Sequence, residues 1–389
     1  MSVIPYGRQQ VTAEDVEAVK LAVQAPFLTQ GPGVAEFEGR LAELVGARYA
    51  VAMNSGTAAL HAAYAAAGLQ VGERVVTTPI TFAATANASR YLGGDVRFVD
   101  VDPVNILLDP AGLVDGLRTG ERIVTPVHFG GAVAPMERLR AVADSSGAMV
   151  VEDAAHSLGS RYLDAAGHEY SVGSCRHSEM ACFSFHPVKH ITTGEGGAVT
   201  TNDRDLYRRL LRFRTHGITR EPSELSLDEG PWYYEQHELG FNYRIPDLNT
   251  ALGLSQLSRL DQMVQRRRYI AALYDEAFAS VPGVEGVPDA PWSRSSYHLY
   301  VIRVDPLRRR GIFEALRQRG LGVNVHYLPV YRHPYYQRTG FAGFSLPEAE
   351  RYYASAISIP MYPDLTDAQI DHVIATVRDV VAQASWAVG

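Results

Sequence analysis

The feature that most constrains the fold is a series of short apolar runs, which alternate with helical or turn segments from about residue 48 onward. Each run is continuous in apolar residues, whereas a strand with one solvated face would alternate apolar and polar residues. The runs are YAVAM (49–53), RVVTTPI (74–80), VRFVDV (96–101), RIVTPVHF (122–129) and AMVVEDAAH (148–156). Strands buried on both faces have this composition, so the sequence predicts an α/β fold with a mostly parallel sheet covered by helices.

The pattern changes near residue 247. From 246 to about 281 it indicates one long helix, followed by a strand at 298–304, a helix at 308–320, a strand at 323–328 and a closing helix from Asp367. The apolar stripe of the long helix comprises Leu248, Leu252, Leu257, Leu260 and Val264. We therefore expect a large domain over residues 1–250 and a smaller α/β domain over residues 251–389.

The segment 219–236 is polar, acidic and rich in turn-forming residues, so it is expected to be a mobile surface loop. The formal net charge of −7 argues against a general nucleic-acid binder, which would present a basic face. An anionic substrate must then be held by local cationic groups.

Two cysteines, Cys175 and Cys182, are too few for a disulfide framework and fit no common zinc spacing, so we expect buried thiols and no metal. The N-terminal MSVIPYGRQQ lacks the apolar region of a signal peptide, and no apolar run reaches 18 residues. We expect a cytoplasmic protein with no membrane segment.

Lysine occurs only at Lys20 and Lys189, and all other side chains of the Lys and Arg class are arginine. Arginine forms no stable imine with an aldehyde, so a Schiff-base cofactor would have two candidate lysines. Lys20 lies in a charged helical pattern and is expected to be solvated. Lys189 follows the apolar run FSF and precedes the glycine-rich TTGEGG. An enclosed lysine has its charged form disfavoured, which suits imine chemistry.

Three further positions fit a site at the ends of the strands. Asp153 follows a buried strand and could face a pyridinium nitrogen, although a solvated acid at a strand end has the same pattern. The turn Asn54–Thr57 enters a helix and could bind a phosphate, or Ser55 or Thr57 could be an ordinary helix N-cap. Phe82 could stack on a cofactor ring or belong to the core.

Five segments, in this order along the chain, resemble the nucleotide-sugar aminotransferases of the aspartate-aminotransferase fold (fold type I). They are SGTAAL, TPITFAATANA, EDAAHSLG, FSFHPVKHITTGEGGAVTTND and HELGFNYRIPDLNTALGLSQL. The resemblance covers nearly the whole chain. It implies a pyridoxal-5′-phosphate (PLP) cofactor, glutamate as amino donor, a nucleotide-sugar acceptor, and a homodimer with composite active sites.

The resemblance also assigns roles residue by residue. Lys189 would be the Schiff-base lysine, Asp153 would pair with the pyridine nitrogen, Phe82 would stack on the ring, and His156 would contact the ring hydroxyl where many relatives carry glutamine. The residues implied to hold the phosphate are Gly56, Thr57, Ala58 and Ser184, with Asn242 reaching it from the partner subunit. The residues implied to contact substrate are Tyr6, His326 and Tyr327.

Within the family, the sequences TTPITFAATAN and FSFHPVKHITTGEGGAVTTND resemble those of the transaminases of pseudaminic acid synthesis. This resemblance implies a UDP-linked 4-keto-6-deoxy-N-acetylhexosamine as acceptor. Tyr331 departs from the second histidine that many family members carry after the His326–Pro329 segment. The alternatives are a dTDP-keto-sugar aminotransferase, a PLP-dependent sugar dehydratase, in which histidine replaces the lysine, and a non-catalytic PLP-binding regulator.

Overall fold

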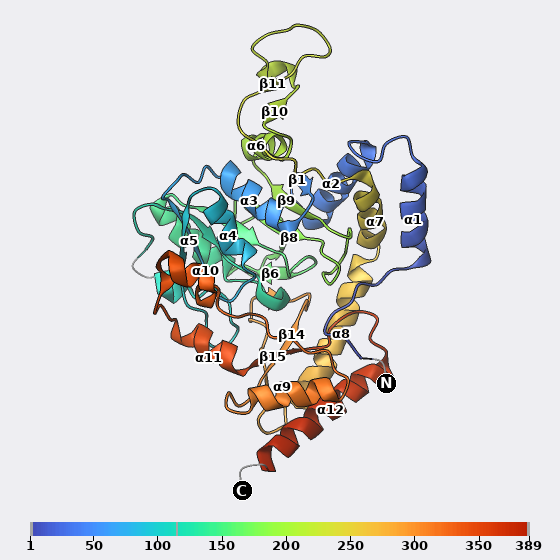
Figure 1. Cartoon of the computed structure of the whole chain (residues 1–389), viewed down its shortest axis with the longest axis vertical. Helices are drawn as coiled ribbons and strands as arrows, with labels where there is room; N and C mark the ends of the chain where they lie inside the picture. The colour runs from blue at the N-terminus through green and yellow to red at the C-terminus, as the bar shows by residue number, and fades with distance from the viewer. Residues whose placement is uncertain (1–2, 114–115, 387–389) are drawn as a thin grey trace.

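The computed structural model describes residues 3–113 and 116–386, and its centre is a seven-stranded sheet (Figure 1). In spatial order the strands are β1 (Tyr49–Met53), β9 (Gly197–Thr201), β8 (Met180–Ser184), β5 (Met149–Asp153), β4 (Glu121–Thr125), β2 (Arg74–Thr77) and β3 (Asp95–Phe98). Only β9 runs against the other strands of this sheet. The predicted α/β fold with a mostly parallel sheet is confirmed.

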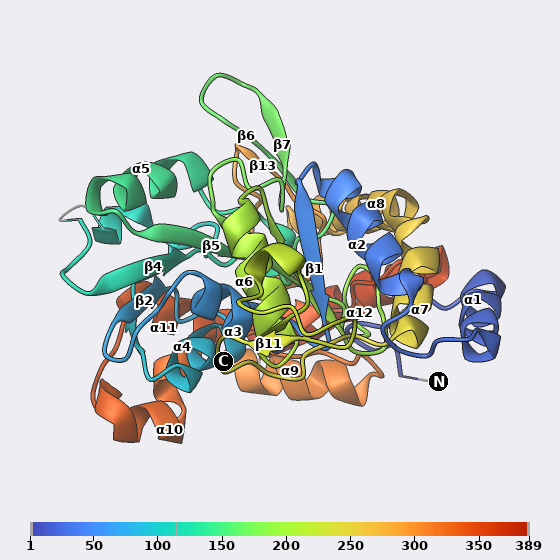
Figure 2. The same cartoon turned by 90° about the horizontal axis from the view of Figure 1, so that it is seen from above.

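Helices cover both faces of this sheet. The helices that pack on its strands are α2 (Pro32–Val45), α3 (Gly56–Ala66), α4 (Ala84–Tyr91), α5 (Met136–Ser146) and α6 (Arg204–Arg214), while α7 (Asp247–Leu257) packs on α2 and α1 (Ala13–Gln24) packs on α7. Seen from above, β1 runs between α2 and α6 (Figure 2). Ala50 and Ala52 of β1 join the hydrophobic core that contains α2, while Val51 and Met53 join the core that contains α6. Burial on both faces explains why the YAVAM run is apolar throughout.

The direction of the strands places the loops of the site. Because β1, β2, β4, β5 and β8 all run the same way, the segments that follow them emerge at one edge of the sheet. That edge therefore receives the turn at Asn54, the segment at Phe82, Asp153 and the segment that leads to Lys189. Ligands of open α/β sheets bind at such an edge.

A second hydrophobic core lies in the C-terminal part of the chain. A three-stranded antiparallel sheet of β12 (Glu285–Gly286), β14 (Tyr300–Arg303) and β15 (Ala356–Ile359) packs there with α8 (Leu260–Phe278), α9 (Arg309–Gln318) and α12 (Asp367–Trp386). Ile4 belongs to this core and Leu260 to the core of the large sheet, so segments cross between the two parts. The boundary at residue 250 stays a prediction. Short helices α10 (Pro334–Tyr336) and α11 (Pro347–Ser355) lie before β15.

Two predicted elements of the C-terminal part were wrong. The single long helix is broken at Ser258–Arg259 into α7 and α8, and the buried face of α7 contains Asp247, Thr250, Gly253 and Gln256 while its leucines are half-buried. Tertiary packing of α7 on α1 and α2 overrides the apolar periodicity there. The predicted strand at 323–328 is also not formed. Asn324 makes one isolated bridge to Ser358, after which the chain turns into a cavity.

Two hairpins project from the sheet. The segment expected to be a surface loop forms one of them, with β10 (Ile218–Thr219) paired to β11 (Glu235–Gln236), and it extends well beyond the remaining elements (Figure 1). The other joins β6 (Arg161–Leu163) to β7 (Glu169–Ser171), and β13 (Ser293–Arg294) completes that small sheet. Both cysteines are free and buried, as predicted.

Two kinds of feature are absent from residues 3–113 and 116–386. None of these helices is both long and apolar enough to cross a membrane. No group of three histidine, cysteine or acidic side chains among the same residues is arranged to hold a metal ion.

Candidate active site

A cavity of about 990 Å³ opens at the edge where the parallel strands end. Its walls come from both parts of the chain: the turn after β1, the segment after β2, the ends of β5 and β8, and residues 324–328 of the C-terminal part. We call it the cofactor cavity. The predicted site residues that line it are Tyr6, Gly56, Thr57, Phe82, Asp153, His156, Ser184, Lys189, His326 and Tyr327.

The two lysines lie in contrasting environments. Lys20 is exposed on α1 and pairs with Glu17 at 3.0 Å, as expected for a solvated lysine. Lys189 lines the cofactor cavity, and burial lowers its pKa to about 8, while the carboxylate of Asp153 opposes that shift. A sizeable fraction of neutral amine at neutral to mildly alkaline pH is what a nucleophilic lysine requires.

Asp153 is the buried carboxylate of the cavity. It ends β5 and is 5% exposed; one oxygen accepts a hydrogen bond from Thr85 Oγ1 at 2.7 Å and the other from the Ala155 N–H at 3.2 Å. Burial raises the pKa of Asp153, and the bond from Thr85 works against that rise. Among the described residues no cationic group is within ion-pair distance of this carboxylate, so the site suits a ligand that carries a positive charge.

The adjacent acid, Glu152, points to the opposite face of β5. It is fully buried and pairs with His128, whose Nε2 lies 2.8 Å from Glu152 Oε2. The Ala134 N–H donates to Nδ1 of His128, so Nε2 carries the proton that bonds the carboxylate. Because successive residues of a strand face opposite sides of the sheet, Asp153 points into the cofactor cavity while Glu152 packs against His128 on the other side.

The start of α3 forms the other end of the cavity. Ser55 is the N-cap, accepting from the Ala58 N–H at 3.1 Å, while the amides of Gly56 and Thr57 precede the first intrahelical bond. A Cβ on Gly56 would lie 2.8 Å from Ser184 Cβ, so a side chain there would clash. Free amides at a helix start, with a serine hydroxyl close by, are suited to a phosphate. Ala58 is buried and does not line the cavity.

His156 bonds to Tyr327 across the cavity wall. Its Nδ1 accepts from the Gly130 N–H at 3.4 Å, so Nε2 keeps the proton and donates to the Tyr327 hydroxyl oxygen at 3.1 Å. Burial lowers the pKa of His156 well below its usual value, and a positive charge on Lys189 or His326 would lower it further. The neutral ring leaves the Tyr327 O–H proton available to a ligand.

Tyr6 and His326, predicted to contact substrate, lie side by side on the wall from the C-terminal part, with ring centroids 5.2 Å apart. Nδ1 of His326 is 2.8 Å from the Ser358 hydroxyl, which orients the ring. Phe82 is 63% exposed and its ring lies 6.3 Å from that of Tyr327. Phe82 is therefore part of the cavity wall and not of the core.

Asn242 lies outside the cofactor cavity of its own chain. Its side chain is exposed, and its carbonyl accepts from the Asn54 side chain at 3.3 Å. An action on the partner subunit's cofactor stays a prediction.

Sequence reasoning missed two residues of this site. Thr85 holds Asp153, and His298 lines the cavity with its ring centroid 4.4 Å from that of His156. Thr85 lies within the TPITFAATANA segment, but a threonine in a helix is no signal by itself. His298 comes from a different part of the chain, and only the tertiary structure brings it to the site.

The comparisons with known proteins agree with this geometry. Residues 9–378 match the profile of the DegT/DnrJ/EryC1/StrS aminotransferase family, and the chain belongs to that family. It is 37% identical to the spore coat polysaccharide biosynthesis protein SpsC of Bacillus subtilis, over 98% of each chain. It is 35% identical to the UDP-4-amino-4,6-dideoxy-N-acetyl-beta-L-altrosamine transaminase of Campylobacter jejuni, over 93% of each.

Among solved structures, PseC of Helicobacter pylori, an aminotransferase involved in the biosynthesis of pseudoaminic acid, superposes with a TM-score of 0.90 at 29% identity. The match covers 98% of this chain and 100% of that one. Aminotransferases of the family depend on PLP, and solved relatives include a PLP form. The chain is a PLP-dependent sugar aminotransferase of fold type I, as the sequence predicted.

Proposed function

We propose that the protein transfers an amino group from glutamate to the C4 ketone of a UDP-linked 4-keto-6-deoxy-N-acetylhexosamine. The observation that carries the aminotransferase chemistry is Lys189 in one cavity with the buried carboxylate of Asp153. The acceptor is supported by the similarity to the altrosamine transaminase and to PseC.

The residues of the cavity fit PLP. Asp153 would meet the pyridine nitrogen, the Gly56 and Thr57 amides with Ser184 would hold the phosphate, and Phe82 would cover the ring. When bound, PLP supplies an electron sink for the bond changes at the amino carbon.

The chain's own residues would handle the protons. With PLP bound, Lys189 would take a proton from the donor α-carbon and pass it to the former aldehyde carbon of PLP, since a pKa of about 8 lies near working pH. Asp153 would remain ionised opposite a cationic ring nitrogen. Tyr327, held by His156, can donate its hydroxyl proton in a hydrogen bond to a ligand oxygen. Walls from both parts of the chain shield these groups from water.

The proposal includes a homodimer with composite sites, in which Asn242 reaches the phosphate in the partner subunit. Asn242 is exposed and outside its own cofactor cavity, which leaves it free for such a role. Mixing Lys189→Ala subunits with Asn242→Ala subunits would place both damaged residues in one site of each heterodimer and leave the other site intact. Recovery of activity after subunit exchange is expected, and no recovery despite exchange would overturn the cross-subunit role. The cytoplasmic location expected from the sequence stays a prediction.

The acceptor is tested by competition between a UDP-4-keto-6-deoxy-N-acetylhexosamine and a dTDP-4-keto-6-deoxyglucose, with glutamate as donor. We expect a higher kcat/KM for the UDP sugar and poor use of sugars whose ketone is at C3. A preference of tenfold or more for the dTDP sugar, about 1.4 kcal/mol in the transition state, would reject the UDP acceptor and leave the transaminase assignment unchanged.

Two alternatives, a sugar dehydratase and a non-catalytic regulator, are separated by other observations. A sugar dehydratase is disfavoured because Lys189 occupies the position where those relatives carry histidine. A non-catalytic PLP-binding regulator would keep the visible absorbance of its bound cofactor when glutamate is added, whereas the proposed enzyme would lose it.

A further inference from the structure

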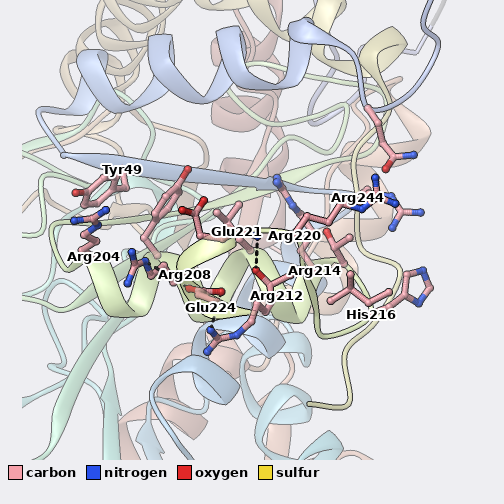
Figure 3. A pocket seen from close by; sticks show the side chains of 16 residues that line it. Tyr49, Arg204, Arg208, Arg212, Arg214, His216, Arg220, Glu221, Glu224 and Arg244 are labelled. Carbon is pink, nitrogen blue, oxygen red and sulfur yellow. Dashed lines mark hydrogen bonds and ion pairs between the residues drawn. The ribbon is translucent and has the colours of Figure 1, made fainter. Parts of the chain in front are cut away.

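A second cavity, of about 810 Å³, lies between α6, β1 and the segment that leads into the β10–β11 hairpin (Figure 3). We call it the arginine cavity. Six of its lining residues are arginines: Arg204, Arg208, Arg212, Arg214, Arg220 and Arg244. Its lining carboxylates are Glu221 and Glu224, so its wall carries a surplus of positive charge in a protein whose net charge is −7.

The arginine cavity is separate from the cofactor cavity. The two share no lining residue, and the segment 242–244 runs between them. The Asn54 N–H, at the wall of the cofactor cavity, donates to the Tyr243 carbonyl at 2.9 Å, and the next residue, Arg244, lines the arginine cavity. A ligand in the arginine cavity therefore does not contact Lys189 of the same chain.

Three of the arginines form a row along α6. Arg204, Arg208 and Arg212 are four residues apart, and like charges at this spacing destabilise a helix. Glu224 lies 3.7 Å from Arg208 and 3.4 Å from Arg212, and Glu238 lies 3.1 Å from Arg212, so the two carboxylates offset the repulsion at that end. Among the described residues, no carboxylate is within ion-pair distance of Arg204 at the other end. The row is thus incompletely neutralised by the chain itself.

The other three arginines of the cavity, Arg214, Arg220 and Arg244, differ in the partners that their guanidinium groups have. Arg214 is committed to the fold, since its guanidinium bonds Glu38 and the Ala52 carbonyl. Arg220 lies over the Tyr234 ring, 5.5 Å from its centroid. Neither Arg220 nor Arg244 has a carboxylate of the described chain within ion-pair distance. Together with Arg204, they leave three guanidinium groups around the cavity to meet an external anion.

An aromatic pair adjoins the arginine row. Tyr49 of β1 and Tyr207 of α6 line the cavity with their rings stacked, 4.6 Å between centroids and 15° between planes. Tyr49 lies beside Arg204 (Figure 3), and Tyr207 lies on α6 between Arg204 and Arg208 in sequence. Guanidinium groups bind phosphate oxygens in bidentate fashion, and tyrosine rings accept the face of a base. A site that offers both is suited to a nucleotide.

We propose that the arginine cavity binds a nucleoside diphosphate group, with its phosphates on Arg204, which has no carboxylate partner among the described residues, and on Arg208, whose ion pair with Glu224 is long, and with its base stacked on the outer face of the Tyr49–Tyr207 pair. The cavity volume of about 810 Å³ is large enough for such a ligand. Glu224 pairs with Arg208 and Arg212 and not with Arg204, so the end of the cavity near Arg204 keeps its positive charge. The group can arrive as a free nucleotide or as the nucleotide part of a sugar substrate that extends from another subunit.

The test is calorimetric titration of the holoenzyme with UDP and with pyrophosphate. Arg204→Gln/Arg208→Gln removes two guanidinium groups from the wall, and Arg310→Gln, on the exposed face of α9, is the matched control. We expect the double variant to bind both probes at least tenfold more weakly and the control to bind them as the wild type does. Wild-type affinity for UDP in a folded double variant would overturn the proposal.

A second variant checks the base. Tyr207→Leu is expected to weaken UDP binding severalfold and to leave pyrophosphate binding unchanged, with the melting temperature measured to verify the fold. Equal loss for both probes in a folded protein would contradict base stacking. The KM of the sugar acceptor in the double variant distinguishes the sources. A raised KM assigns the group to the acceptor, and an unchanged KM with lost UDP binding assigns it to a free nucleotide.

Discussion

The two cavities, separated by the segment 242–244, carry their charges in opposite ways. The cofactor cavity holds one lysine, Lys189, and one buried carboxylate, Asp153, and burial shifts the pKa of both toward the neutral form. Three histidines of its wall also favour the neutral form, because burial lowers the pKa of His156, His298 and His326. The arginine cavity has half-exposed or exposed guanidinium groups that remain charged at all working pH values. In the cofactor cavity, burial therefore brings the pKa values of the side chains toward the range in which they exchange protons. In the arginine cavity, the guanidinium groups stay charged and can bind an anion.

The largest effect is expected at the lysine that burial prepares. Lys189→Ala should lower kcat by at least about 1000-fold, because proton transfer by a positioned side chain alone contributes about 10²–10⁴-fold and the covalent link to the cofactor is lost as well. Turnover with glutamate and absorbance of the cofactor are the measurements. Lys20→Ala, which alters the only other lysine, is the control and should behave as the wild type. Substantial turnover in Lys189→Ala would show that the buried lysine of the cofactor cavity is not the catalytic lysine.

Asp153→Asn is expected to have the next largest effect. The amide cannot hold a positive charge on the ring nitrogen, so kcat should fall about 100-fold or more, the range seen when a preorganised electrostatic group is removed. Cofactor content should fall much less, since the phosphate end of the cavity is unchanged. Absorbance and single-turnover rates separate the two. Near-normal turnover would show that the buried carboxylate has no role toward the ring.

A smaller effect is expected in the pH dependence of stability of the cofactor-free protein. The pKa of Lys189 is about 8 in the folded chain, whereas the ordinary value for a solvated lysine is 10.5. Between these two pKa values the unfolded chain binds more protons at this lysine than the folded chain does. The contribution of Lys189 to the free energy of unfolding therefore rises with pH over this range and is lowest below pH 8. Lys189→Met should therefore raise the melting temperature at pH 7, with an advantage that shrinks from pH 8 upward. An advantage independent of pH would mean that the amine is not desolvated.

The smallest effect is expected in the arginine cavity. Glu224→Gln removes the carboxylate near Arg208 and Arg212, but these ion pairs are partly exposed and long, so the free energy of unfolding should change by no more than about 1 kcal/mol. Pyrophosphate should bind more tightly, because a competing negative charge is gone. Denaturant unfolding and titration measure the two quantities. A loss of several kcal/mol would indicate that this cavity is built for stability and not for binding.

Several features of the molecule followed from local patterns alone. The continuous apolar runs predicted the parallel sheet, because strands buried on both faces need apolar residues at every position. The scarcity of lysine pointed to Lys189, and the two lysines differ in the structure as their sequence surroundings indicated. The ordered set of motifs identified the family, and four of the five motifs contribute residues to the cofactor cavity.

Other features were decided only by tertiary structure. The helix break at Ser258–Arg259 depends on how α7 packs against α1 and α2, which periodicity does not record. Thr85 meets Asp153, and His298 meets His156, only because the chain brings distant segments together. The arginine row on α6 looks like an ordinary solvated helix face in the sequence, and it becomes the wall of a cavity because the β10–β11 hairpin and β1 fold beside it. Local sequence determines which residues can carry the chemistry, whereas burial and charge balance depend on neighbours that only the folded chain supplies.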